Sequence, residues 1–236
     1  MKNSVICPNC KTPNPFYNSI CSNCKFYLRE KISNLDLWSL LGLIVENPSK
    51  AFRTIIFSEH KNFIYFVIFF VSIKYLINAR FVSMLSIGEF QSTVGLEISL
   101  FIVLLITLLF FLIFSTVYFS FMKLMNIEVR FRDIFAILIY SQVPFIFGLI
   151  ILFSLELVIF GDFLFSINPT PFILKGSIAY MFLALEISTS IWSSVLVYKA
   201  FLCLSQSFSF SLGATFTLIV LLSGLIYIYS LTVFTL

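Results

Sequence analysis

Two pairs of cysteines near the N-terminus are the residues best suited to chemistry in this sequence. Cys7 and Cys10 form the first Cys-x-x-Cys pair, Cys21 and Cys24 form the second pair, and ten residues separate the two pairs. Each pair can form a tight turn, a knuckle, that offers two thiolates to one metal ion, so two knuckles complete a tetrahedral four-sulfur site. The spacing therefore predicts a zinc ribbon over residues 1–29, with these four cysteines as the metal ligands.

We expect the metal in this site to be structural. A closed site of four thiolates has no open position for a substrate, so the metal folds the segment and does not catalyse. Zinc is the natural metal for four thiolates, and rubredoxin-like iron or disulfide pairs are the alternatives. Disulfides require an oxidising compartment, and the first thirty residues lack the apolar stretch and cleavage site of a signal peptide.

Asparagine and proline residues in the same segment favour turns. Asn9 and Asn23 lie inside the two cysteine pairs, and asparagine tolerates the backbone angles of a tight turn. The Asn14-Pro15 step and a Tyr-Asn step follow between the pairs. We therefore expect a short hairpin between the two knuckles.

The composition of the whole chain indicates an integral membrane protein. Hydrophobic residues make up 60% of the 236 positions and charged residues only 11%, whereas a soluble domain carries roughly 25% charged residues. The mean hydropathy is +1.04. So few charges cannot cover a surface that faces water. The net charge of +4 is explained by orientation in the membrane and does not indicate a nucleic-acid partner.

Five apolar stretches follow the N-terminal segment. A membrane-spanning helix needs about 20 apolar residues, and these runs are continuous rather than alternating, which favours helices over barrel strands. Pro144 should kink the third stretch. The fold class that we predict is an all-α membrane protein with five transmembrane helices and a small N-terminal zinc ribbon. The predicted spans are residues 63–79, 98–122, 134–160, 176–202 and 210–236.

Residues 30–61 form a juxtamembrane zone ahead of the membrane domain at 62–236. The apolar stretch 35–45 is too short to span a bilayer, and Asn47-Pro48 ends it and can begin a second helix. One face of that second helix carries Phe52, Ile55, Ile56 and Glu59. The two helices either lie in the cytoplasmic interface as amphipathic helices or pack on the spans as ordinary core helices.

Lysine and arginine are distributed unevenly among the connections between the predicted spans. Eight precede the first span, three lie in the second connection and one in the fourth, whereas the first and third connections hold one each. Because cytoplasmic loops are enriched in these residues, the bias of twelve to two predicts a cytoplasmic N-terminus and an external C-terminus. We expect a prokaryotic plasma membrane, with the cysteines in a reducing compartment.

Three charged residues fall inside predicted spans: Lys74, Glu156 and Glu186. A charge there costs roughly 2.5–3.5 kcal/mol on insertion scales, so each should face a partner or water. One expectation is an ion pair between Lys74 and Glu156, with Glu186 near the midplane as the functional candidate. The alternative is that Lys74 snorkels outward, Glu156 lies at a helix end, and Glu186 is protonated and hydrogen-bonded to Ser or Tyr.

Two further segments carry a recognisable pattern. Residues 42–53 include Pro48-Ser-Lys-Ala-Phe52, and residues 131–144 include Phe131-Arg132-Asp133, Tyr140 and Pro144. The first resembles the P-x-x-x-F step that precedes the first span in the Yip (Ypt-interacting protein) superfamily. The second resembles the entry to the third span of the same family. The resemblance covers residue 37 to the C-terminus.

The resemblance implies a five-helix membrane bundle and a non-enzymatic role in membrane organisation or trafficking. Some bacterial and archaeal members carry a zinc ribbon in front of the bundle, as this chain does. The Asp-Leu-Tyr-Gly-Pro-like motif of the eukaryotic trafficking members is missing, so binding to Rab-type GTPases does not carry over. The resemblance supplies no catalytic residues for this chain.

These observations lead to two hypotheses for the function. The first is a non-enzymatic scaffold or adaptor in the lipid bilayer, with a cytosolic protein partner bound through the zinc ribbon and homo-oligomers as a further assembly. The alternative is a small transporter or channel subunit that uses Lys74, Glu156 and Glu186. The sequence contains no metalloprotease pattern, nucleophile elbow or phosphate-binding glycine loop, so we predict no enzymatic activity.

Overall fold

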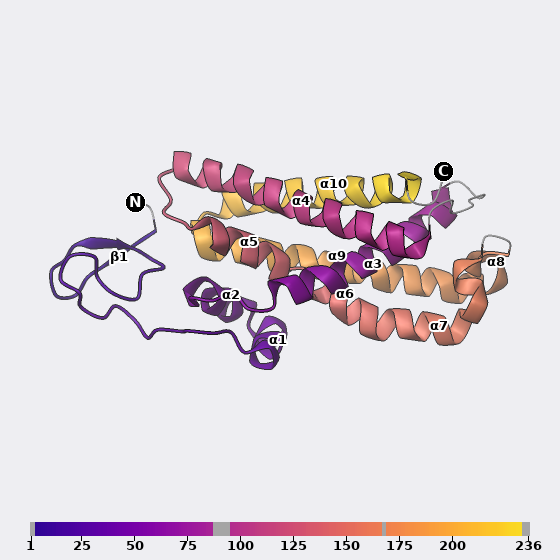
Figure 1. Ribbon diagram of the computed structural model, residues 1–236, viewed down its shortest axis with the longest axis horizontal. Helices are drawn as coiled ribbons and strands as arrows, with labels where there is room; N and C mark the ends of the chain where they lie inside the picture. The colour runs from indigo at the N-terminus through magenta and orange to yellow at the C-terminus, as the bar shows by residue number, and fades with distance from the viewer. Residues whose placement is uncertain (1–2, 87–94, 167–168, 233–236) are drawn as a thin grey trace. The chain divides into compact units, whose positions relative to one another are not determined.

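A computed structural model of the chain describes residues 3–86, 95–166 and 169–232 (Figure 1). A two-stranded antiparallel sheet of β1 (Ser4–Ile6) and β2 (Pro13–Pro15) is followed by helices. The α-helices are α1 (Leu37–Glu46), α2 (Pro48–Phe57), α3 (Ile64–Ser86), α4 (Leu96–Leu124), α5 (Phe131–Tyr140), α6 (Val143–Phe147), α7 (Ser154–Phe160), α8 (Pro171–Leu174), α9 (Gly176–Ser205) and α10 (Phe208–Thr232). A π-helix, η1 (Gly148–Phe153), precedes α7, and a 3-10 helix, η2 (Gly161–Phe165), follows it.

The chain divides into two compact units, each built from three segments. Unit 1 comprises Met1–Ile64, Phe110–Ser141 and Val195–Phe216, and unit 2 comprises Tyr65–Leu109, Gln142–Ser194 and Thr217–Leu236. Helices α4, α9 and α10 therefore contribute one part of their length to each unit. The four cysteines belong to unit 1, and Lys74, Glu156 and Glu186 belong to unit 2.

Five helical stretches in the described residues are long and apolar enough to span a membrane, which confirms the predicted fold class. They are Ile64–Met84, Glu97–Leu124, Phe131–Phe165, Gly176–Ser205 and Phe208–Leu231. The last four residues of the predicted fifth span, 233–236, lie outside the described residues.

The first span is longer than the sequence suggested, because the charged Arg80 does not end it. Helix α3 continues to Ser86, and the Arg80 guanidinium, within unit 2, donates a hydrogen bond of 2.8 Å to the carbonyl of Phe165. An arginine whose charge is hydrogen-bonded to the backbone can remain inside an apolar helix. Arg80 is the one basic residue that the sequence placed in the first connection between spans, and that placement was therefore wrong.

The third span is interrupted close to Pro144. Helix α5 ends at Tyr140, and α6 begins at Val143 with the proline in its first turn. Proline has no N–H to donate, and the first turn of a helix is where that loss costs least. In unit 2, the Gln142 side chain accepts hydrogen bonds from the hydroxyls of Tyr75 (3.0 Å) and Ser193 (2.9 Å). The expected kink is thus a change from one helix to the next, stabilised by buried polar contacts.

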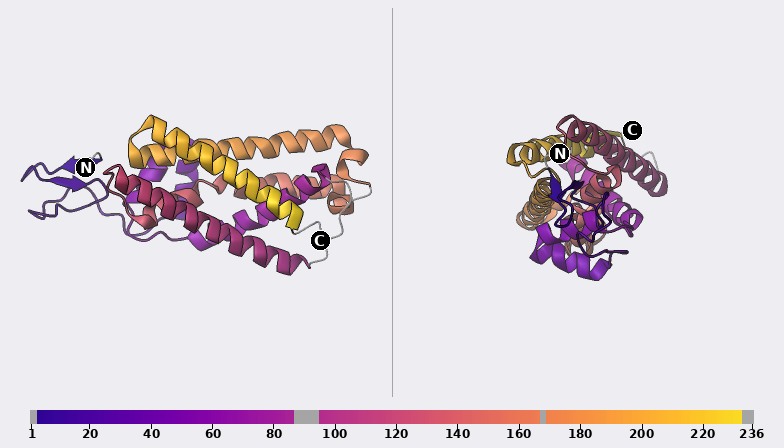
Figure 2. Two further views of the ribbon diagram at one scale, coloured as in Figure 1. Left: turned by 90° about the horizontal axis from the view of Figure 1, so that it is seen from above. Right: turned by 90° about the vertical axis from the view of Figure 1, so that its left-hand side faces the viewer.

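Within unit 2, the segments of α4 and α10 lie side by side, as the views in Figures 1 and 2 agree. The hydroxyl of Tyr229, which is fully buried, contacts the Thr107 hydroxyl at 3.0 Å and donates to the Val103 carbonyl at 3.3 Å. A second part of this unit packs Phe160, Leu164, Ala179 and Phe182 into an apolar cluster.

The two predicted juxtamembrane helices are present as α1 and α2, and capping residues determine where they begin. The Asp36 carboxylate accepts the Ser39 N–H at 2.9 Å, and the Asn47 side chain accepts the Lys50 N–H at 3.1 Å. These bonds satisfy N–H groups that a helix start leaves without intrahelical partners. The proline at the start of α2 occupies the favoured N1 position.

Helix α2 is a packed core helix of unit 1. Phe52, Ile55 and Ile56 are fully buried, and α2 packs against α5. This arrangement favours the interpretation of α2 as an ordinary core helix over that of an amphipathic helix in the cytoplasmic interface. Glu59 does not share the apolar face as expected, because α2 ends at Phe57 and the Glu59 carboxylate pairs with Lys31 at 3.1 Å.

A buried ionic network holds the end of α2 against α5. Asp133 on α5, 1% exposed, accepts hydrogen bonds from Arg130 at 2.7 and 3.1 Å and pairs with Lys61 at 3.1 Å. Lys61 also donates to the Ile55, Ile56 (3.1 Å) and Ser58 (2.8 Å) carbonyls. Arg130 donates to the Ile56 carbonyl at 2.7 Å.

The network stabilises the C-terminal end of α2. The two cations satisfy carbonyl groups that the C-terminus of α2 leaves without intrahelical partners, and the Asp133 carboxylate neutralises the cations. Burial lowers the pKa of Lys61 to about 8, although the charge and hydrogen bond of Asp133 act in the opposite direction. Asp133 is therefore the group that keeps Lys61 charged in this environment.

We expect Asp133→Asn to destabilise the protein. The amide has nearly the shape of the carboxylate but leaves two partly or fully buried cations without an anion, which should lower the free energy of unfolding by about 3 kcal/mol. Thermal unfolding of the purified protein in detergent measures the change. Asp162→Asn, at an exposed position in η2, is the matched control. A melting temperature equal to that of the control would show that the network is not needed for stability.

Candidate metal centre

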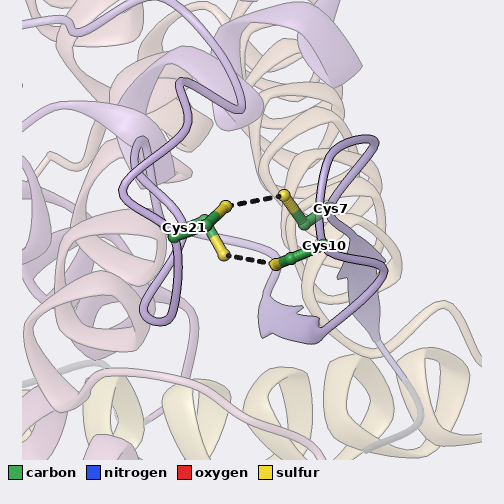
Figure 3. Close-up of side chains that lie close together, drawn as sticks. Cys7, Cys10 and Cys21 are labelled. Atoms are coloured by element: carbon green, nitrogen blue, oxygen red, sulfur yellow. Dashed lines mark hydrogen bonds between the residues drawn. The ribbon is translucent and has the colours of Figure 1, made fainter.

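The four cysteines of the N-terminal segment come together in unit 1. Their sulfur atoms all lie within 4.8 Å of one another. The closest distances join the two pairs: 3.6 Å from Cys7 to Cys24, and 3.6 Å from Cys10 to Cys21. Figure 3 shows the Cys7 and Cys10 thiols directed toward the side of the second pair, where Cys21 lies.

The donor set and its spacing fit a tetrahedral metal ion. Four thiolates at about 2.3 Å from a central metal place neighbouring sulfur atoms about 3.8 Å apart. The closest observed separations of 3.6 Å are near that value. All four cysteines are free thiols, so the disulfide alternative does not describe this structure. The cluster can therefore hold a metal, with each cysteine supplying one sulfur ligand.

The two knuckles share the same backbone arrangement. In the first, the Lys11 N–H bonds to the Cys7 carbonyl at 3.0 Å, and in the second the Lys25 N–H bonds to the Cys21 carbonyl at 3.2 Å. Lys11 and Lys25 have φ of +59° and +61°. The left-handed conformations thus fall on the residue after each pair and not on Asn9 or Asn23, which corrects the turn prediction.

The hairpins also differ from the prediction. Strands β1 and β2 pair on either side of the first knuckle, with Ile6 opposite Pro13. An isolated bridge between Ile20 and Tyr27 flanks the second knuckle. Each Cys-x-x-Cys turn is itself the tight reversal of the chain, so a hairpin surrounds each pair instead of joining the two pairs.

Asn14 links the two halves of the site and was not identified from the sequence as more than a turn residue. Its side chain is fully buried. The amide donates to the Thr12 carbonyl at 2.9 Å and to the Cys21 sulfur at 3.4 Å. The amide oxygen accepts from the N–H (2.8 Å) and the hydroxyl (2.9 Å) of Ser22. Donation to sulfur stabilises a thiolate, the form that binds metal.

The sulfur atoms differ in their electrostatic surroundings. Hydrogen bonding with the side chain and backbone of Thr12 lowers the pKa of Cys10 to about 5. For Cys24, the backbone hydrogen bond from Phe26 lowers the pKa, but burial and the neighbouring sulfurs outweigh it and raise the pKa to about 11. Four thiolates this close repel one another. A cluster with all four sulfur atoms ionised therefore needs a cation at its centre to offset the repulsion.

Asn3 fixes the start of this segment to other parts of unit 1. Its side chain is 2% exposed, and it accepts the Glu128 N–H at 3.0 Å. It donates to the carbonyls of Glu128 at 3.0 Å and Leu204 at 3.2 Å. These hydrogen bonds join residues that are far apart in the sequence, so residue spacing does not predict them. Asn3 was therefore not among the predicted site residues.

Aromatic and cationic side chains add further contacts between the ribbon and the helices of unit 1. The Arg130 guanidinium lies 4.6 Å from the centre of the Tyr17 ring, and the Arg29 guanidinium lies 3.5 Å from the centre of the Phe57 ring. The Phe16 ring meets Phe57 edge to face at 5.9 Å. Cation–π contacts of this kind contribute about 0.5–2 kcal/mol each. The ribbon is therefore packed on the helices and not tethered loosely to them.

The charged residues inside the predicted spans do not form the ion pair that was expected from the sequence. In unit 2, Lys74, with a fully buried side chain, pairs with Glu186 at 2.5 Å. Because α3 continues past residue 79, Lys74 lies well inside its helix. The expected pair of Lys74 with Glu156 and the snorkelling of Lys74 were both wrong. Glu156 is 1% exposed, and neither of its carboxylate oxygens has a hydrogen-bond partner among the described residues.

Comparison with known families identifies most of the chain. Residues 41–233 match the family model described as the Yip1 domain. The match covers well over half of the sequence and includes both segments on which the resemblance to the Yip superfamily rested, so that resemblance is confirmed. No curated protein and no solved structure matches the chain.

The environment of Asn14 leads to a prediction about metal affinity. Asn14→Ala removes the donor to the Cys21 sulfur and the bridge to Ser22 but leaves the four cysteines. We expect the affinity for zinc to fall about 10–100-fold, as for other residues that support metal ligands. Competition with a chromophoric chelator, on the purified full chain, measures this. Asn9→Ala, at an exposed position inside the first knuckle, should leave the affinity unchanged, and equal affinities in the two variants would refute the role of Asn14.

Proposed function

This chain belongs to the Yip1 domain family of membrane proteins, and from that membership we propose that it is a non-enzymatic membrane scaffold or adaptor whose N-terminal ribbon binds zinc and a cytosolic protein. In this proposal residues 1–29 form the partner-binding module. Residues 30–61 connect that module to the membrane, and residues 62–236 form the Yip1-type membrane domain.

Zinc is the metal that we propose for the four-cysteine site. Four thiolates without an open position are typical of structural zinc, and soft thiolate ligands disfavour magnesium and calcium. A segment of about thirty residues has too little core to fold without a metal or another cross-link. The zinc would therefore be a folding element that creates a binding surface, with Cys7, Cys10, Cys21 and Cys24 as its ligands.

The observation that carries the adaptor proposal is the exposure of apolar side chains on the ribbon. Ile6 is 66% exposed and Tyr27 is 74% exposed, and the other such side chains are Val5, Ile20 and Phe26. Other ribbon residues, including Asn3 and Phe16, are buried in unit 1. Apolar side chains displayed on a fixed module are typical of a protein-binding surface.

The proposed orientation places this surface in the cytoplasm. The lysine and arginine bias of the sequence supports a cytoplasmic N-terminus and an external C-terminus, in a prokaryotic plasma membrane. A cytoplasmic ribbon would keep its thiols reduced and able to bind zinc. The partner in this proposal is therefore a cytosolic protein, since such a protein has access to the ribbon.

A transporter or channel subunit is the second candidate, because Lys74, Glu156 and Glu186 lie in the spans of unit 2. The hydroxyls of the helices favour the scaffold. Several of them donate to the carbonyl one turn earlier in the same helix, as Ser72 does to Ile68 and Ser188 to Ala184. Such hydroxyls are satisfied within their own helix and do not by themselves form a polar pathway.

Site-specific photo-crosslinking in native cells tests the adaptor proposal. A photoreactive residue at position 6 or 27 should yield a discrete adduct with one cytosolic protein. The Cys21→Ser background should abolish the adduct, because a ribbon without its metal loses its fold. The same probe at Val158, 83% exposed on α7, is the control and should give no such adduct.

Three results would refute the adaptor proposal. One is the lack of any protein adduct from the ribbon positions. Another is an adduct that persists unchanged in the Cys21→Ser background, and the third is an adduct with twice the mass of this chain, which would identify a second copy as the partner.

A further inference from the structure

Unit 2 contains a cavity of about 210 Å³ among membrane-spanning helices. Helices α3, α7, α9 and α10 line it, and its polar lining includes Asn78, Glu156, Glu186, Ser190 and Ser223. The remaining lining residues are apolar. A share of about 30 Å³ per water in the liquid means that the cavity can hold a small ion together with water.

Four oxygen atoms of the residues that line this cavity have no hydrogen-bond donor among the described residues. Both carboxylate oxygens of Glu156, Oε2 of Glu186 and the side-chain oxygen of Asn78 are buried and have no hydrogen-bond partner among the described residues. The other carboxylate oxygen of Glu186 bonds to Lys74, and the Ser190 hydroxyl is directed to the Glu186 carbonyl at 3.2 Å. Four acceptors with no donor are a costly arrangement in an apolar region, and the arrangement fits a positively charged ligand.

The charge balance of the residues around the cavity also indicates a positively charged ligand. Glu156 and Glu186 supply two negative charges when ionised, and Lys74 supplies one positive charge. The surplus is one negative charge, and an unpaired buried charge is strongly unfavourable. One monovalent cation removes the surplus, whereas a divalent cation would leave one positive charge in its place.

The backbone next to Glu156 is also unusual. The π-helix η1 ends at Phe153, directly before α7, which carries Glu156. A Cβ added at Gly148, the first residue of η1, would lie 3.4 Å from Cε of Lys74 and 3.5 Å from Cγ2 of Thr189. Both are ordinary van der Waals distances, so the backbone of η1 lies close to the lysine stem within unit 2. Short π-helical insertions occur frequently at functional sites.

We propose that this cavity binds one alkali-metal cation, sodium or potassium, through oxygen atoms of Glu156, Glu186 and Asn78. Carboxylate and amide oxygens are the ligands that hard cations prefer. A proton alone on Glu156 would turn one of the four acceptors into a donor for the other three and leave most of the cavity unused. The site goes beyond the proposed adaptor function and depends neither on the ribbon nor on its partner.

The thermal stability of the purified full chain in lipid nanodiscs tests the site. N-methylglucamine chloride is replaced stepwise by sodium or potassium chloride at constant ionic strength and constant pH. A ligand that binds only the folded protein raises the melting temperature, and we expect a rise of at least about 2 °C with one of the two ions. Glu156→Gln, which keeps the shape but cannot ionise, should abolish the response.

Two further variants make the result specific. Asn78→Ala should shift the midpoint of the response to about tenfold higher ion concentration, through the loss of one ligand. Glu97→Gln, an exposed carboxylate of the same unit, should respond as the wild type does. Radiolabelled sodium or rubidium bound by the wild-type protein, at one ion per chain, gives a direct measurement that does not depend on how well the variants fold.

Several outcomes would overturn the proposal. These are a wild-type melting temperature that is independent of both ions, an undiminished response in folded Glu156→Gln, and the lack of bound radiolabel. A wild-type protein that is stabilised by lower pH but by neither ion would show that the cavity takes a proton and not a metal cation.

Discussion

The neutralisation of buried charge is the constraint on which the rest of this structure depends. With only 11% charged residues and five spans in an apolar environment, each buried ion needs an opposite charge or a backbone dipole nearby. Asp133 meets this requirement with Arg130 and Lys61, and Lys74 meets it with Glu186. The four sulfur atoms at the N-terminus meet it only if a metal cation joins them.

Arg130 connects these requirements within unit 1. Its guanidinium bonds to the Asp133 carboxylate and to the Ile56 carbonyl at the end of α2, and it also covers the ring of Tyr17 in the ribbon. The same side chain thus contributes to the packing of α2 on α5 and to the position of the ribbon. This shared contact explains how the four-cysteine segment is held at a fixed place on the helices of unit 1.

The sequence predicted the features that depend on short separations or on long runs. Cys-x-x-Cys spacing identifies four candidate ligands because each knuckle is local, and uninterrupted apolar runs identify spans because the bilayer sets their length. The partner of Lys74 could not be predicted in this way, since a pairing across 112 positions depends on how helices rotate and pack. Asn14 and Asn3 were missed for a similar reason: their buried hydrogen bonds follow no periodic pattern. Arg80 was placed in a loop because its carbonyl partner at Phe165 is likewise distant in sequence.

We propose that a metal ion folds the ribbon by neutralising four clustered thiolates. Elemental analysis of the purified chain is the measurement that decides this. We expect one zinc per chain in the wild type, and a lower content in the Cys21→Ser variant, whose membrane-spanning helices should remain folded. Wild-type protein that is folded, with its cysteines reduced and without bound metal, would show that the ribbon does not need a metal to fold.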